Sequence, residues 1–284
     1  MLSSQRELFD IPGDVCFLNA ASYSPLPLAT LDAGRKAVAR KGRPWLIDHK
    51  FASKQYERAR NAAARLINAD PEDVALISSV GYGVAAAAKI LPVPTRSRVL
   101  VLQDDHSSPV LEWMTRADAG DFTVEIVRRP GNGDWTEALL SAIARTGAAP
   151  IAIVSISSVH WSDGGAVDLD LVAPAVRAQG AALLVDATHS AGVTNLDVRA
   201  LDPDFVVFPT YKWLLGPYGR AFLYIRSATK EAFRLNRRAT GDEPCAPKTT
   251  STSATSATSA ARGGSTWASA IFSFRWRWPR SAWR

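Results

Sequence analysis

The chain is poor in cysteine and has no long apolar run. Its 284 residues include two cysteines, Cys16 and Cys245, which are too few for a disulfide framework. The apolar runs fall well short of the length that a membrane-spanning helix needs. The polar start, MLSSQRELFDIPGD, lacks the character of a signal peptide. We therefore expect a cytoplasmic protein that does not bind a membrane.

The chain also lacks a general excess of charge, although its formal net charge is +6. Residues 234–284 hold nine Lys or Arg and two Asp or Glu, a net +7, so the remainder carries 24 basic and 25 acidic residues, a net −1. The basic charge thus belongs to the last part of the chain, and we expect no nucleic-acid partner. The length is sufficient for one large domain with a real core.

Short apolar runs alternate with helical patterns through most of the chain. Strands are predicted at 74–78, 98–102, 123–127, 151–156, 182–185, 205–208 and 220–225. Helices are predicted at 30–41, 52–68, 84–90, 135–144 and 169–179. This order predicts an α/β fold with a mainly parallel sheet flanked by helices.

Two predicted strands end at polar residues in the stretch 181–219, AALLVDATHSAGVTNLDVRALDPDFVVFPTYKWLLGPYG. Asp186 ends the first strand, His189 follows three residues later, and Lys212 follows the second strand. Because open α/β sheets bind ligands at the carboxyl ends of their strands, we expect these three side chains to converge on one ligand. A lysine for a Schiff base and a carboxylate for a pyridinium nitrogen are what pyridoxal phosphate (PLP) chemistry requires.

The segment V-D-A-T-H-S-A-G followed by T-Y-K-W-L-x-G-P resembles the class V aminotransferase family of fold-type I PLP enzymes. That family includes cysteine desulfurases, kynureninases and isopenicillin N epimerase. The resemblance implies the large domain of that fold, with Lys212 as the Schiff-base lysine and Asp186 on the pyridine nitrogen. It also implies that His189 lies near the ring hydroxyl, and that Tyr211 replaces a residue that often contacts the phosphate. No metal site is expected.

The stretch G-Y-G-V-A-A, which begins at Gly81 and opens the predicted helix 84–90, allows two interpretations. After a strand it imitates a dinucleotide fingerprint, and Asp104 and Asp105 lie about 20 residues further on, where that motif places its ribose carboxylate. Alone, it predicts an NAD-dependent oxidoreductase, which leaves the later Asp, His and Lys unexplained. In the PLP interpretation the backbone N–H groups of Gly81 and Tyr82 hold the cofactor phosphate at a helix N-terminus.

A second segment supports the resemblance. Asp105 and His106 open D-H-S-S-P, which together with Trp113 resembles the family's E-H-x-x-N segment and its tryptophan. The resemblance implies that His106 stacks on the pyridine ring; otherwise it is an ordinary residue at a helix N-terminus. Ser158 matches a position where the family often has Asn near the ring hydroxyl. The adjacent 160–161 pair, His-Trp, either lines a substrate pocket or packs in a capped loop.

The chain divides into three predicted parts. Residues 1–50 form an N-terminal segment over the active site, since 17–27 resembles the corresponding segment of class V enzymes. Residues 51–238 form the PLP-binding large domain. Residues 239–284 form a low-complexity tail that contains TTSTSATSATSAA and then four of the nine tryptophans, interspersed with arginine.

This tail predicts a disordered or out-of-frame segment. With a suitable choice of codons, a shift of one base converts its S-T-W-A-S-A into F-D-M-G-E-R. The small C-terminal domain of fold-type I enzymes, which usually carries the arginine for the substrate carboxylate, is then missing. A catalytically inactive remnant therefore stays open as an alternative.

The leading expectation is a PLP-dependent enzyme that acts on an amino-acid-like substrate. The substrate amine displaces Lys212 and the freed lysine moves protons at the α-carbon, while the pyridinium paired with Asp186 takes up the carbanion charge. Transamination, epimerisation, desulfuration and C–C hydrolysis share these steps. Desulfuration ranks lower, because Cys245 lies in the tail and Cys16 precedes the site region. A homodimer is expected if the full-length fold is present.

Limited proteolysis tests the predicted tail. Ser, Thr and Ala repeats bury too little apolar area to offset the entropy of ordering the chain. We expect protease to trim this end first and to leave a core that ends near residue 238, as measured by mass spectrometry. A tail that resists protease, in a chain that turns over amino acids, would contradict the prediction.

Overall fold

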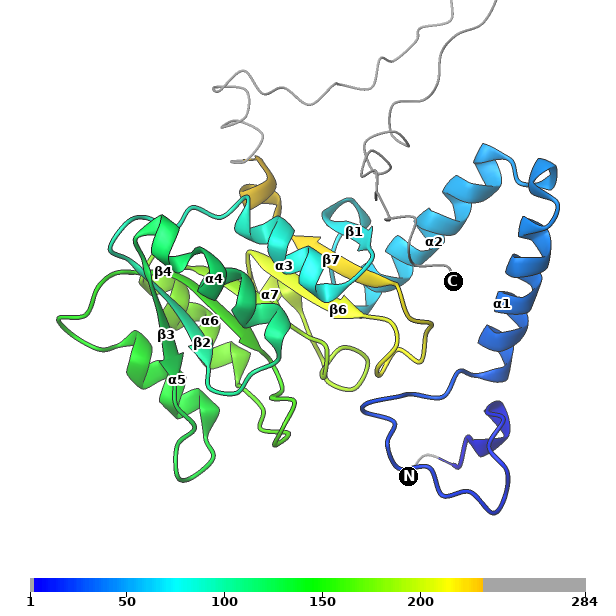
Figure 1. Ribbon diagram of the computed structural model, residues 1–284, viewed down its shortest axis with the longest axis horizontal. Coiled ribbons are helices and arrows are strands. Elements are labelled where there is room, and N and C mark those ends of the chain that lie inside the picture. Colours follow the sequence, from blue (N-terminus) through cyan, green and yellow to red (C-terminus); the bar gives the residue numbers. More distant parts are fainter. Residues whose placement is uncertain (1–2, 232–284) are drawn as a thin grey trace, which may run out of the picture. The chain divides into compact units, whose positions relative to one another are not determined.

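The computed structural model (Figure 1) describes residues 3–231 and contains one seven-stranded sheet in the order β1-β7-β6-β5-β4-β2-β3. The strands are β1 (Val74–Ile77), β2 (Arg98–Leu102), β3 (Thr123–Val127), β4 (Ile151–Ser157), β5 (Ala182–Asp186), β6 (Phe205–Pro209) and β7 (Ala221–Ile225). β7 pairs antiparallel with both of its neighbours, and the other pairs are parallel, so β7 alone runs against the rest. The predicted α/β fold with a mainly parallel sheet is confirmed.

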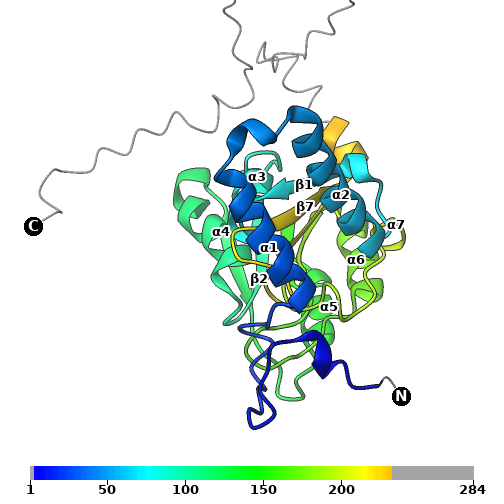
Figure 2. The ribbon, with the colours of Figure 1, turned by 90° about the vertical axis from the view of Figure 1, so that its right-hand side faces the viewer.

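The helices cover both faces of the sheet (Figures 1 and 2). The helices within residues 3–231 are α1 (Leu28–Lys41), α2 (His49–Leu66), α3 (Val80–Ala88), α4 (Ser107–Gly120), α5 (Trp135–Ile143), α6 (Leu169–Ala178) and α7 (Val198–Leu201), with 3-10 turns at Arg6–Leu8, Pro44–Leu46 and Pro71–Asp73. α3 and α4 pack on one face, and α2, α5, α6 and α7 contribute to the core on the other.

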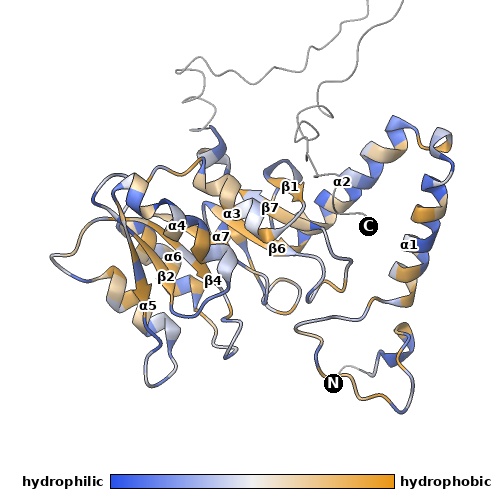
Figure 3. Cartoon of the chain, viewed as in Figure 1, coloured by the Kyte–Doolittle hydropathy of each residue, from blue (hydrophilic) through white to orange (hydrophobic). Residues whose placement is uncertain are grey.

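The strands at the centre of the sheet are buried on both faces, and Figure 3 shows their apolar character. In β2, Val99 and Val101 join the core beneath α3 and α4, whereas Leu100 and Leu102 join the opposite core. This alternation follows from the two-residue period of a strand. Continuous apolar runs are typical of parallel strands that helices cover on both sides.

The main differences from the predicted elements concern helix beginnings. α3 starts at Val80, four residues earlier than expected, because the Ser79 hydroxyl accepts a hydrogen bond from the Tyr82 amide at 3.2 Å and caps the helix. Gly81 and Tyr82 therefore lie in the first helical turn and not in a loop. α4 was missing from the prediction; its Pro109 lies in the first turn, where the absent N–H does not interrupt the helical hydrogen bonds.

The carboxyl ends of three parallel strands lie side by side. Ser157 at the end of β4 is in register with Asp186 at the end of β5, and Asp186 is in register with Val207 of β6. The chain that leaves β6 leads directly into Lys212. The sheet thus delivers the polar residues of the predicted site to a single edge.

Within residues 3–231, no helix combines the length and the apolar character that crossing a membrane requires. None of the residues of α1 is buried. The predicted tail at 239–284 lies outside the described residues.

Gly83 tests how closely α3 approaches the sheet. A Cβ atom at Gly83 would lie 2.7 Å from Val207 Cγ1 and 2.8 Å from Ile77 Cδ1, whereas one at Gly81 would meet its nearest atom at 3.9 Å. We expect Gly83→Ala to lower the free energy of unfolding by about 1–3 kcal/mol through overpacking. Gly81→Ala, the matched control, should change it by no more than about 1 kcal/mol and in the stabilising direction. Equal effects in urea unfolding would contradict this packing.

Candidate active site

Asp186 is the buried charge of the site. It ends β5 with 1% of its surface exposed, and both the amide and the hydroxyl of Thr188 donate to its Oδ1. Its Oδ2 accepts no hydrogen bond from residues 3–231. Burial raises the pKa of Asp186 to about 7, against the lowering effect of the Thr188 hydrogen bonds; the charge of Asp105 raises it further and that of Lys212 lowers it. A nearby cation would therefore stabilise the ionised carboxylate.

His189 lies half-buried, three residues after Asp186. Burial lowers the pKa of His189 to about 4, and the positive charges of Lys212, His106 and His160 act in the same direction. The imidazole is therefore neutral near pH 7, and one ring nitrogen donates while the other accepts. Lys212, His106 and His160 belong to three segments that are distant from His189 in the sequence.

Lys212 is carried on a tight loop that follows β6. The Gly216 amide donates to the Thr210 carbonyl at 2.7 Å, and a Cβ atom at Gly216 would lie 2.7 Å from Thr210 Cβ, so only glycine fits there. Burial lowers the pKa of Lys212, and the charge of Asp186 opposes that shift. The ammonium nitrogen lies 5.5 Å from the centroid of the Tyr211 ring. The structure thus brings Lys212 and Asp186 within electrostatic reach of each other, as the sequence predicts.

The N-terminal segment contacts the loop that carries Lys212. The Ser24 hydroxyl donates to the Tyr211 carbonyl at 2.7 Å. The Tyr211 ring packs against Tyr218 with centroids 4.7 Å apart, and Tyr23 meets Tyr218 edge-on at 6.5 Å. That residues 1–50 cover the active site stays a prediction, and these contacts are in its favour. The contact of Tyr211 with a phosphate also stays a prediction.

The N-terminus of α3 presents backbone amides for an anion. Tyr82 N–H is already used by the Ser79 cap, and the Tyr82 side chain is 60% exposed. The amides of Val80 and Gly81 donate to no acceptor within residues 3–231. The free amide of Gly81 is in favour of the predicted phosphate contact, and the contacts of Gly81 and Tyr82 with a phosphate both stay predictions. Val80 was missed, although Ser79 before an apolar helix is a recognisable N-cap signal.

His106 begins α4 as its N-cap. Its Nδ1 accepts from the Ser108 amide at 3.4 Å, and its ring lies edge-on to Trp161 with centroids 6.3 Å apart. The Trp161 indole donates to the Asp104 carbonyl at 2.6 Å, which anchors that contact. The helix N-terminal alternative therefore describes the local geometry of His106, and stacking on a cofactor ring stays a prediction.

Two further predictions concern the residues after β4. The hydroxyls of Ser158 and Ser190 lie 2.6 Å apart, so Ser158 is engaged beside the end of β5. His160 is buried, stacks on Trp135 with centroids 4.8 Å apart, and bonds through Nε2 to the Gln103 carbonyl. The packing alternative is thus correct for His160.

Sequence reasoning missed two residues that hydrogen-bond at this edge of the sheet: Thr188, which donates to Asp186, and Asp105, which accepts from Ser157. The Thr188 amide donates to the Asp186 carboxylate and so orients it. Asp side chains readily form such a turn with the backbone two residues later. Asp105 accepts hydrogen bonds from Ser157 at the end of β4. Asp105 belongs to the D-H pair of the resemblance, but the PLP interpretation gave a role only to the histidine.

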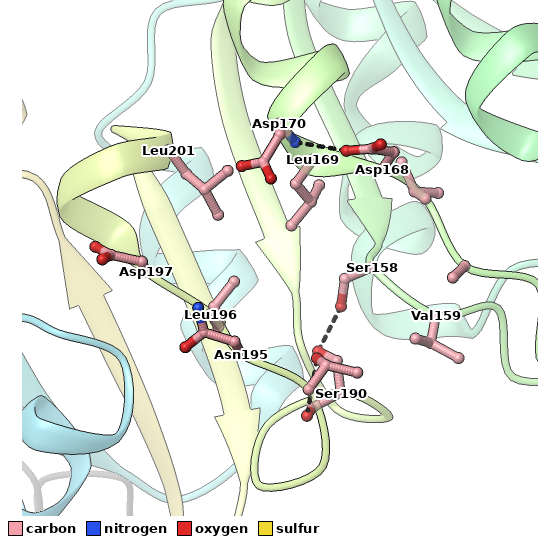
Figure 4. A pocket seen from close by; sticks show the side chains of 13 residues that line it. Ser158, Val159, Asp168, Leu169, Asp170, Ser190, Asn195, Leu196, Asp197 and Leu201 are labelled. Atoms are coloured by element: carbon pink, nitrogen blue, oxygen red, sulfur yellow. Dashed lines mark hydrogen bonds between the residues drawn. The ribbon is translucent and has the colours of Figure 1, made fainter.

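A cavity of about 210 Å³ lies beside this cluster (Figure 4). Ser158 and Ser190 line it on the side of the site. Asp168 and Asp197 also line it, but their carboxylates cap α6 and α7. Of the residues predicted to contact the cofactor, Ser158 lines this cavity, whereas Asp186, His189 and Lys212 do not, so the cofactor prediction does not depend on it.

The sheet order contradicts the dinucleotide interpretation of the Gly81 segment. A dinucleotide fingerprint belongs to a unit in which the strands on either side of the helix are parallel and close together. Here β1 and β2 flank α3 in sequence, but β7, β6, β5 and β4 lie between them in the sheet. The NAD-dependent alternative is therefore wrong, because it requires the strands before and after α3 to lie close together in the sheet.

The profile of the Aminotransferase class-V family matches residues 16–275. The chain belongs to this family. The match extends past residue 238, where the motifs that we recognised end. The prediction of a class V, PLP-dependent enzyme is confirmed at the level of the family.

Relatives of this class V chain are 25% to 29% identical to it over their matched parts. It is 29% identical to the uncharacterized aminotransferase YcbU of Bacillus subtilis, over 68% of this chain and 50% of the relative. It is 28% identical to a probable cysteine desulfurase of Methanothermobacter thermautotrophicus, over 76% and 54%. Other relatives are named kynureninase and isopenicillin N epimerase. The chain spans about half the length of the curated relatives that it matches.

Among solved structures, the class V chain resembles C-DES, in a mutant that has glycine covalently linked to its PLP cofactor. The TM-score is 0.71 at 21% identity, over 81% of this chain and 61% of C-DES. This likeness shows a shared fold.

The described residues fit PLP. Asp186 Oδ2 accepts no hydrogen bond within residues 3–231 and so suits a protonated pyridine nitrogen. Two unpaired amides at the start of α3 suit a phosphate. Lys212, with its pKa lowered by burial, suits a carbonyl carbon.

The raised pKa of Asp186 predicts a specific pH dependence of stability. The ordinary value is 3.8 and the folded value is about 7, so the unfolded chain releases its proton first as pH rises. The free energy of unfolding of the cofactor-free protein should fall, relative to Asp186→Asn, by up to about 1.4 kcal/mol per pH unit between pH 4 and 7.

His189 has the opposite sign over the same range, because its folded pKa is lowered. It is present in both proteins, so the difference between them isolates Asp186. Urea unfolding at pH 4, 5.5, 7 and 8 measures the difference. A constant difference across the series would show that Asp186 is not buried as described.

Proposed function

We propose that this chain binds PLP and, in its complete form, catalyses a reaction at the α-carbon of an amino-acid-like substrate. The observation that carries the proposal is the placement of a buried Asp186 and a partly buried Lys212 at adjacent strand ends, within electrostatic reach of each other. Family membership supplies the prior expectation for this pair.

Each residue has a distinct part in the proposal. Lys212 would bind the aldehyde carbon of PLP and would exchange protons with the substrate α-carbon. Asp186 pairs with the pyridine nitrogen, which lets the bound cofactor act as an electron sink. His189, neutral near pH 7, hydrogen-bonds the ring hydroxyl, and His106 packs against the ring. The amides of Val80 and Gly81 hold the phosphate.

The reaction itself is chosen by groups beyond this constellation. Relatives named aminotransferase, desulfurase, kynureninase and epimerase differ in what happens after the α-carbon is activated. Cys16 is an exposed free thiol in the N-terminal segment, and Cys245 lies outside the described residues. Desulfuration, which needs a reactive cysteine in the distal part of the chain, therefore ranks lower. A catalytically inactive remnant that still binds PLP is the alternative.

We infer that a second copy of the chain covers α1. No residue of this helix is buried, and its Val38 is 75% exposed, while Trp45 just after it is 78% exposed. Leu46, next to Trp45, is 61% exposed as well, and a group of exposed apolar side chains, unlike a single one, marks an interaction surface. Light scattering after gel filtration should give the mass of a dimer, and Trp45→Glu should give the mass of a monomer. A wild-type monomer at micromolar concentration would refute the inference.

Covalent trapping tests Lys212. Reduction with borohydride in the presence of PLP should leave a pyridoxyl group on the peptide that contains Lys212. Lys212→Ala should lose both this adduct and the visible absorbance band of lysine-bound PLP. Lys89→Ala removes an exposed lysine at the end of α3 and serves as the matched control. An adduct of wild-type yield in Lys212→Ala would show that another lysine binds the cofactor.

A further inference from the structure

Asp105 connects two strand ends of the site. It lies on the link between β2 and α4, and its Oδ2 accepts from the Ser157 amide at 3.0 Å while its Oδ1 accepts from the Ser157 hydroxyl at 2.6 Å. The same Oδ1 accepts from the His106 amide at 2.7 Å. One carboxylate therefore holds the end of β4 and the N-cap residue of α4 together.

This connection joins the predicted cofactor residue His106 to the end of the strand that neighbours Asp186. Ser157 is in register with Asp186, so the donor that Asp105 holds belongs to the strand directly beside the predicted pyridine partner. His106 is the residue predicted to face the ring. The negative charge of Asp105 also raises the pKa of Asp186. Three hydrogen bonds to one ionised group are worth more than bonds between neutral groups.

We propose that Asp105 is a positioning residue: its carboxylate fixes His106 relative to the end of β4 and sets the electrostatic environment of Asp186. The inference rests on the proposed function, because it assumes that His106 and Asp186 face PLP. Asp105 need not touch the cofactor. It acts through the geometry of His106 and through its own charge.

Asp105→Asn changes the chemistry with little change in size. One carboxylate oxygen becomes an NH₂ group, which must then oppose a Ser157 or His106 donor, and the negative charge is lost. We expect PLP to bind about tenfold more weakly to the full-length variant. Asp105→Glu keeps the charge and both acceptors, and should recover most of the affinity.

Asp104→Asn is the matched control. It removes one negative charge from the neighbouring position, which is exposed and has a φ of 56°, a conformation that Asn tolerates. Its PLP affinity should equal that of the wild-type chain. Thermal unfolding of all four proteins without cofactor shows whether each is folded.

A second readout needs no cofactor. Carbon-13 NMR of carboxyl-labelled Asp gives the ionisation midpoint of Asp186 in the cofactor-free chain. The titratable groups that act on it or share its surroundings are Asp105, Lys212, Tyr211 and His189. Loss of the Asp105 charge should move the midpoint to lower pH in Asp105→Asn, whereas Asp105→Glu and Asp104→Asn should leave it near the wild-type value.

The outcomes separate this inference from the proposed function. Wild-type PLP affinity and an unchanged Asp186 midpoint in a folded Asp105→Asn would overturn the inference while PLP binding stands. No saturable PLP binding in the wild-type chain would refute the proposed function, and the NMR midpoint would still test the charge of Asp105. If Asp105→Asn does not fold, Ser157→Ala removes a single donor and should weaken PLP binding about fivefold; wild-type affinity in that variant would overturn the inference.

Discussion

The burial of one carboxylate at the end of β5 is the constraint on which the site depends. Ionised oxygen atoms lose much hydration free energy when they leave water, and the protein must return it through hydrogen bonds or a counter-charge. Asp186 receives two hydrogen bonds, both on one oxygen and both from Thr188. Since the remaining compensation within the described residues is the charge of Lys212, the pKa stays near 7. A protonated ring nitrogen would supply the missing counter-charge, so we expect PLP and Asp186 to stabilise each other's ionised forms.

The N-cap residues of the helices at the site differ in charge from those of the other capped helices. α2, α5, α6 and α7 are capped by Asp residues, whose charge satisfies the amides and repels other anions. α3 and α4, which begin at the site edge, are capped instead by Ser79 and His106. A neutral cap at α3 leaves two amides unpaired and adds no negative charge. The helix that is expected to bind a phosphate is thus capped without an acidic side chain.

Pattern reasoning found the sheet because central parallel strands are continuous apolar runs with polar ends. It also placed Asp186, His189 and Lys212 together, since carboxyl ends of parallel strands share an edge. It failed where the answer depends on contacts between distant segments. The burial of His160 against Trp135 and the link from Asp105 to Ser157 join residues about 25 and 50 positions apart, and no local period reports such contacts.

Local reasoning also failed at α3, for a different reason. Glycine has low helix propensity, so a helix that contains two glycines in its first turns was predicted to begin after them. Packing against the sheet explains why glycine occupies position 83 and why the helix forms there. Gly83 lies against Val207 and Ile77 with no room for a Cβ atom, so the residue that weakens the isolated helix is the one that lets it approach the sheet.

We expect cofactor binding and turnover to be separable in this chain. The buried carboxylate, the lysine, the two histidines and the free amides all lie within residues 3–231, and the seven strands that position them are within the same range. The relatives extend to about twice the matched length, and a substrate carboxylate would need a cationic partner beyond this constellation. We therefore expect PLP binding to depend on groups within residues 3–231, namely Asp186, Lys212, the two histidines and the free amides of α3. Turnover depends in addition on what grips the substrate, which is why a spectroscopic test of the cofactor site is informative even for a chain without activity.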